Sequence, residues 1–198
     1  EIMIEDLARF ARAIKIKYHS KSVELGLFVV RSFVRFLFEM GVCTANVSKM
    51  RIPKGYSARK DPLTPEEYVA ILTQISPRKP LGIRDNMIVR LLYDTGCRVG
   101  ELAQLNEIPF TGKTYVTIHT EKTPDARILS WSEDTAVFMR SWNKQKGSRP
   151  LVPSTRQIDR IVKRYAEAAG IQKRVHPHLF RHSKAHLILD NGGTVRDV

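Results

Sequence analysis

The periodic pattern of apolar residues disappears between Met50 and Pro62, and this gap constrains how the chain can fold. Apolar residues recur at helical spacing before the gap, and helical order resumes at Thr64. The intervening stretch combines proline, glycine and basic residues without periodicity, which is typical of an interdomain linker. We therefore expect two domains, over 1–52 and 63–198, joined by a linker over 53–62.

Two amphipathic helices are expected in the first domain. Their apolar stripes are formed by Ile4, Leu7, Phe10, Ala11 and Ile14, and by Val23, Leu27, Val30, Val34 and Leu37. Phe28, Phe33 and Phe36 widen the apolar face of the second helix, which favours a central position in a small bundle. Arg31 and Arg35 are then left for solvent or for a ligand.

The second domain begins with a clear helix start. Thr64 suits the N-cap, Pro65 the first helical position and Glu67 the third, an arrangement that satisfies the free amides of a first turn. The next helix ends near Gly96, which suits a left-handed C-cap. Arg98 therefore falls in the turn or in the first residues of a short helix.

A β-hairpin and two further helices complete the expected fold. Apolar and polar residues alternate from 111 to 131, which predicts a hairpin with its turn at 123–125 and Lys122 at the end of the first strand. Capping signals at 154–157 and a proline before His178 start the two helices. The expected fold class is mainly α with a small β-sheet.

Composition points to a polyanionic partner. The chain has 198 residues, with 33 basic against 20 acidic ones and a formal net charge of +13. Nucleic acid is favoured over a membrane, because the basic residues are spread along both halves and no apolar run approaches the roughly 20 residues that span a bilayer. The two cysteines form no C-x-x-C pair, which argues against a disulfide framework or zinc finger and fits a reducing cytoplasm or nucleoid.

Three groups have chemistry suited to a phosphate. Arg98 offers a planar fork of donors to two phosphate oxygens, and Glu101 on the same helix face would fix that fork, although such a pair is commoner as an ordinary surface ion pair. His178 and Arg181 place a proton carrier beside a cation. Lys122 would suit a proton donor to a leaving oxygen, although a solvated hairpin lysine is the better explanation of this residue taken alone. A metal site built from His178, His182 and His186 is the weaker interpretation.

The order of these groups resembles a known family. The stretches 95–102, 116–129 with Lys122 and Arg127, and 178–182 are similar to the box I, β-hairpin and box II motifs of tyrosine recombinases, the phage integrase family. The resemblance extends to 33–37 and to the junction before 63–67. It implies a helical, SAM-like core-binding domain that binds DNA over 1–52, and a mixed α/β catalytic domain over 63–198 that lacks its C-terminal segment.

The resemblance also implies residue roles. Arg98 and Arg181 would bind the scissile phosphate, Lys122 would be the general acid and His178 would assist proton transfer. Glu101 and His182 would support them. The cations expected to contact DNA are Arg31, Arg35, Lys54, Arg59, Lys60 and Arg127.

In this family a tyrosine attacks the phosphate and forms a 3′-phosphotyrosine, without a metal or other cofactor. The nucleophile follows box II, and no tyrosine follows Tyr165 here. We therefore expect a truncated chain that binds a specific duplex site without forming the covalent link. The expected assembly is a homotetramer at synapsis, formed through the absent segment, in the cytoplasm on the nucleoid. The alternatives are a non-catalytic DNA-binding regulator and a type IB topoisomerase.

Overall fold

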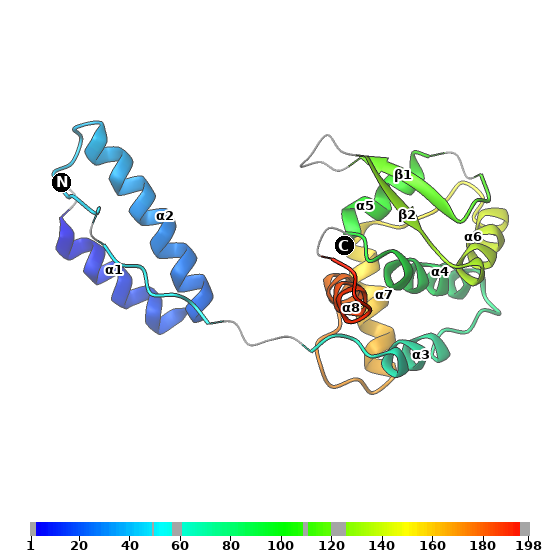
Figure 1. Cartoon of the computed structure of the whole chain (residues 1–198). Coiled ribbons are helices and arrows are strands. Elements are labelled where there is room, and N and C mark those ends of the chain that lie inside the picture. The colour runs from blue at the N-terminus through cyan, green and yellow to red at the C-terminus, as the bar shows by residue number, and fades with distance from the viewer. Residues whose placement is uncertain (1–2, 49, 57–60, 109–110, 120–125, 195–198) are drawn as a thin grey trace. The chain divides into compact units, whose positions relative to one another are not determined.

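The computed structural model describes residues 3–48, 50–56, 61–108, 111–119 and 126–194. The chain forms two compact units, Glu1–Lys60 and Asp61–Val198, which are described separately (Figure 1). Helices dominate both units, and the described sheet has two antiparallel strands. The expected fold class, mainly α with a small β-sheet, is confirmed.

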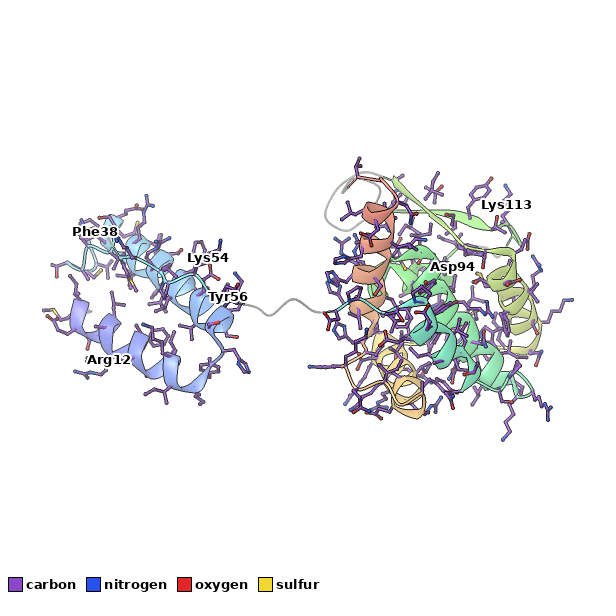
Figure 2. The ribbon with its side chains drawn as sticks, turned by 60° about the horizontal axis from the view of Figure 1, so that its bottom comes forward. Arg12, Phe38, Lys54, Tyr56, Asp94 and Lys113 are labelled. Carbon is purple, nitrogen blue, oxygen red and sulfur yellow. The ribbon has the colours of Figure 1, made fainter. Side chains whose placement is uncertain are left out.

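The first unit is a pair of helices with a returning chain. Helix α1 spans Ile4–Lys17 and α2 spans Ser20–Glu39. After α2, the chain returns toward the start of that helix, where the Ser20 hydroxyl donates to the Tyr56 carbonyl oxygen over 2.8 Å (Figure 2). The Tyr56 amide in turn donates to Ser20 Oγ over 3.0 Å. The described start of the predicted linker is therefore attached to the first unit.

The aromatic face of α2 differs from the sequence expectation. Phe28, Phe33 and Phe36 are 53%, 57% and 54% exposed, so α2 is not the centre of a bundle in the described part of the chain. Its opposite stripe, with Val23, Leu27 and Val34, is buried. The helix has α1 and the chain after α2 as packing partners, and these cover one side of it.

The second unit is organised around one buried helix. Its elements are α3 (Pro65–Thr73), α4 (Pro80–Thr95), α5 (Val99–Ala103), the short 3-10 helix η1 (Gln104–Asn106), β1 (Tyr115–His119), β2 (Ala126–Ser130), α6 (Glu133–Gln145), α7 (Thr155–Ala168) and α8 (Pro177–Asp190). Helix α4 packs mainly against α6 and α8, and also touches α7 and β2 (Figure 1). Its buried residues therefore form the middle of the core.

Local capping signals place the helix ends where the sequence predicts them. Thr64 Oγ1 accepts from the Glu67 amide over 3.2 Å, and Glu67 Oε2 accepts from the Thr64 amide over 2.8 Å. Helix α4 ends at Gly96, whose φ of 56° is left-handed. Ser154 Oγ accepts from the Gln157 amide over 3.4 Å at the start of α7. These contacts are local, which is why the sequence sufficed to predict them.

No helix is predicted from the sequence where α6 lies. The buried stripe of α6 consists of Thr135, Ala136, Met139 and Trp142 at helical spacing, so a sequence signal for this helix was present and was missed. A local N-cap starts the helix, because Ser132 Oγ accepts from the Thr135 amide over 3.3 Å. A tertiary contact supports this start: Asp94 Oδ2 accepts from the Ser132 amide over 2.9 Å and from Thr135 Oγ1 over 2.7 Å. Asp94 lies near the end of α4 (Figure 2). A contact of this range has no signature in the local sequence.

The register of the hairpin decides which residues face the core. Val116 pairs with Leu129, and Ile118 pairs with Arg127. Ile118 and Leu129 are each 1% exposed, so the face that they share is the inner one. Arg127 lies on this inner face. Within the described part of the chain, no helix has the length and apolar character needed to cross a membrane.

Candidate functional site

The turn after α4 gathers two distant arginines. Arg181 Nη1 in α8 donates to the Gly96 carbonyl oxygen over 2.9 Å. Arg127 Nη2 in β2 donates to the Thr95 carbonyl oxygen over 3.5 Å. Carbonyls at the end of a helix lack intrahelical partners and carry the negative end of the helix dipole, so they attract cations. Residues 85 positions apart in the sequence are thereby fixed on one turn.

A third arginine begins the next helix. Arg98 is the N-cap of α5, where its amide donates to Glu101 Oε2 over 2.8 Å and its Nη1 donates to Glu101 Oε1 over 2.9 Å. The Glu101 side chain is 7% exposed, whereas that of Arg98 is 52% exposed. The carboxylate therefore fixes Arg98 from the protein side and leaves the guanidinium open to solvent.

Arg98 and Arg127 share this one carboxylate, and Arg181 lies close enough to feel its charge. Arg127 Nη1 lies 3.8 Å from Glu101 Oε2. The pKa of Arg181 is lowered, first by burial and then by the charges of Arg127 and Arg98, while Glu101 opposes the shift. A guanidinium nevertheless stays protonated at neutral pH. Three positive groups and one negative group leave two uncompensated positive charges, so this arginine cluster (Arg98, Arg127 and Arg181 around Glu101) favours an anion.

His178 lies one helical turn from the arginine cluster. Pro177 opens α8, and the exposed His178 follows it in the first turn. Positions three apart on a helix lie on the same face, so His178 is a neighbour of Arg181. The rings of His176 and His178 are nearly parallel, with centroids 6.5 Å apart. The structure thus places an exposed histidine one helical turn before Arg181 on α8.

His182 occupies a different position on α8. It is half-buried, and its ring meets that of His186 edge to face with centroids 4.5 Å apart. Among the residues that the structure describes, no three His, Cys, Asp or Glu side chains are grouped to hold a metal ion. His182 therefore packs against His186 within α8.

Cys97 lies inside the turn but is unsuited to attack a phosphate. Cys97 follows Gly96 and precedes Arg98 in the sequence, and its side chain is buried. Burial raises the pKa of the Cys97 thiol to about 11, against the effect of a hydrogen bond with Thr95. A thiol in this state is protonated at neutral pH and is a poor nucleophile.

In the first unit, the structure brings some candidate DNA contacts together and separates another. Arg31 and Lys54 line a groove of about 500 Å³ with Lys21 and Phe28. Arg31 Nη1 donates to the Met50 carbonyl oxygen over 3.3 Å, which fixes it beside the returning chain. Arg35 does not line this groove: its Nε donates to Glu39 Oε1 over 2.8 Å.

Three of the cations predicted from the sequence, Lys122, Arg59 and Lys60, lie outside the described residues.

Two structural roles were not predicted from the sequence. Ser183 Oγ accepts from the Leu63 amide over 2.6 Å and donates to the Leu179 carbonyl oxygen over 2.8 Å, which ties the start of the unit to α8. Arg127 faces inward instead of lying on the surface. Its position was readable, because residues 127 and 129 of a strand share one face and Leu129 is apolar.

The comparisons with known proteins cover the part of the chain that contains this site. The model of the phage integrase family matches residues 62–198, which include every residue of the arginine cluster. The chain belongs to the phage integrase family. The curated relatives of this phage integrase chain include tyrosine recombinase XerC from Xanthomonas campestris pv. campestris (strain B100), 28% identical over 189 residues. XerC from Xylella fastidiosa (strain M23) is 28% identical over 190 residues.

The phage integrase chain is shorter than these relatives. The matches cover 90% of the chain and 58% of the Xanthomonas protein or 64% of the Xylella protein. Among solved structures, XerA recombinase is 25% identical with a TM-score of 0.59, covering 100% of this chain and 73% of that one. Lambda integrase bound to DNA is 19% identical with a TM-score of 0.74, covering 94% and 71%, and supports the fold alone.

Proposed function

We propose that this chain binds duplex DNA and holds one phosphodiester in the arginine cluster for site-specific strand breakage and rejoining. The observation that carries the proposal is the set of three guanidiniums gathered at the turn after α4, two of them paired with the buried Glu101 and the third, that of Arg181, bound to the Gly96 carbonyl oxygen. Two uncompensated charges at one point suit one phosphate group. Membership of the phage integrase family supports the same conclusion.

In the proposed reaction, a tyrosine hydroxyl attacks the phosphorus and the bond to the 5′ oxygen breaks. The products are a 3′-phosphotyrosine and a free 5′-hydroxyl, and attack by a partner's 5′-hydroxyl reverses the step. Arg98 and Arg181 stabilise the charge on the non-bridging oxygens, because fixed donors need no reorganisation as charge develops. Lys122 gives its proton to the leaving oxygen, and His178 assists proton transfer. No metal or cofactor takes part.

We propose that none of the six tyrosines of this chain supplies the attacking hydroxyl. Tyr68 and Tyr93 stack with ring centroids 3.7 Å apart, and burial raises the pKa of both. The Tyr165 hydroxyl donates to Asp85 Oδ2 over 3.0 Å, and its pKa is raised as well. These environments disfavour a phenolate, whereas a nucleophile requires activation.

DNA is the proposed partner of both units. The first unit presents Arg31 and Lys54 in the groove beside α2, and Arg35, Arg59, Lys60 and Arg127 complete the cations proposed from the sequence to contact the duplex. Structural neighbours include a lambda integrase dimer bound to a core site and a lambda integrase tetramer bound to a Holliday junction. We propose a homotetramer at synapsis on this basis.

Binding of the chain to a fluorescent duplex of random sequence tests the proposal. Affinity should fall steeply between 50 and 200 mM salt, by about 10³-fold or more if at least six phosphates are contacted. Replacing Arg98 and Arg181 together by glutamine should lower the slope of log affinity against log salt by about 1 for each cation removed. Arg140→Gln, on the α6 surface, is the matched control and should change neither quantity. Affinity that does not depend on salt would contradict the proposal.

The chain should form no covalent adduct with DNA. Nicked duplexes trap a phosphotyrosine by losing the short strand after cleavage, so an active nucleophile would yield a protein–DNA species that survives boiling in detergent. We expect none after incubation with a pool of nicked duplexes under conditions where binding is complete. The appearance of such a species would refute the statement about the six tyrosines, and peptide mapping would identify the tyrosine concerned.

A further inference from the structure

We infer that Arg127 is a positioning residue that couples the hairpin to the arginine cluster, and does not itself contact DNA. The inference rests on the proposed function and replaces surface contact as the role of this residue. The first observation is the strand register. Arg127 pairs with the buried Ile118 across the sheet and shares the inner face with Leu129. A residue on that face points toward the core and away from a ligand at the surface.

Exposure separates Arg127 from Arg98. The Arg127 side chain is 23% exposed, compared with 52% for Arg98, although both approach the same carboxylate. A guanidinium that grips a phosphate has to present its fork outward, as Arg98 does. Arg127 is less exposed, and the groups that its two Nη atoms approach belong to the protein.

Both contacts of Arg127 are with groups that hold Arg98 in place or precede it in the turn after α4. Its Nη2 donates to the Thr95 carbonyl oxygen over 3.5 Å, and its Nη1 lies 3.8 Å from Glu101 Oε2. The first contact joins β2 to the end of α4. The second joins β2 to the carboxylate that also holds the backbone and the side chain of Arg98. One arginine therefore links the hairpin to the two elements that position Arg98.

The place of Arg127 in the chain extends this coupling toward the proposed acid. Arg127 is the second residue of β2, and the connection from β1 to β2, 120–125, contains Lys122. Fixing the start of β2 also fixes the point at which this connection ends. Arg127 thus holds the start of β2 at the arginine cluster.

The decisive variants are Arg127→Gln and Arg127→Lys, compared with Arg98→Gln and with the control Arg140→Gln. Arg140 is 40% exposed and has its Nη2 3.2 Å from Glu133 Oε2, so it loses a similar ion pair away from the site. With a random-sequence duplex as the probe, Arg127→Gln should lower affinity about fivefold and leave the salt slope unchanged, whereas Arg98→Gln should lower the slope by about 1. Lysine should not restore affinity, because it supplies charge without the planar fork.

A thermodynamic cycle with Glu101→Gln adds a second measurement. If Arg127 acts through Glu101, its replacement should have little further effect on affinity in the Glu101→Gln background, because contacting residues are non-additive. The Arg98 Nε–H resonance in a ¹H–¹⁵N spectrum of the folded chain should also shift in both Arg127 variants. It should stay in place in Arg140→Gln.

Three outcomes would overturn the inference. These are a loss of about 1 from the salt slope in Arg127→Gln that lysine restores, strictly additive effects in the cycle, and an unchanged Arg98 resonance. Failure of the wild-type chain to bind any duplex would refute the proposed function instead. The resonance would still decide whether Arg127 positions Arg98, because that measurement requires no DNA.

Discussion

Replacing Glu101 by glutamine should lower the free energy of unfolding of the second unit by about 2 to 4 kcal/mol. Removing one partner of a buried ion pair typically costs about 3 to 5 kcal/mol, and the half-exposed Arg98 reduces this figure through solvent screening. Glutamine keeps the shape of the side chain and one acceptor for the Arg98 amide. It leaves three guanidiniums together without a carboxylate, so charge is the main quantity that changes.

Urea denaturation of wild type, Glu101→Gln and the control Glu133→Gln would measure this effect. Glu133 also pairs with one arginine, but its side chain is 72% exposed, so we expect a change within about 0.5 kcal/mol. Added sulfate should restore part of the stability of Glu101→Gln, because an anion takes the place of the lost charge. Equal losses in the two variants, or no response to sulfate, would show that the arginines do not form one electrostatic unit.

Much of the local structure was predictable because its causes are local. The capping box of Thr64 and Glu67 and the left-handed Gly96 depend on neighbouring residues, and they appear where the sequence predicts them. The Arg98–Glu101 pair was predictable in the same way, since residues three apart on a helix face one another. The strand alternation likewise indicated the hairpin.

The tertiary part of the site has no such local signal. The docking of Arg181 on Gly96 joins α8 to the end of α4, and only the family resemblance associated these segments. The contact of Asp94 with the start of α6 likewise joins residues 38 positions apart, and no local pattern indicates it. The aromatic face of α2 was predicted to be buried in a bundle but is exposed in the described structure. Apolar side chains at helical spacing indicate a face suited to packing, but they do not indicate whether a partner covers it.

Gly96 has both a local and a tertiary role. Its left-handed conformation ends α4, and its lack of a side chain lets α8 pack closely against this turn. A φ of 56° is left-handed, which costs a residue with a side chain about 1 to 2 kcal/mol. A Cβ on Gly96 would also lie 2.8 Å from both Cβ and Cγ of Lys184 in α8. Lys184 is one turn beyond Arg181, so relief of this overlap moves the helix that carries Arg181.

Gly96→Ala should therefore destabilise the second unit by about 2 to 5 kcal/mol, the sum of the backbone cost and about 1 to 3 kcal/mol for overpacking. Gly147→Ala is the matched control: its φ is 59°, but a Cβ there meets nothing within 4 Å, so it bears the backbone cost alone. Urea denaturation of both variants isolates the packing term as their difference. Where Gly96→Ala remains folded, duplex binding should also weaken, because the carbonyl that holds Arg181 has moved. Equal stability losses with unchanged binding would mean that α8 accommodates the methyl group, and that Gly96 serves the backbone turn and not the arginine cluster.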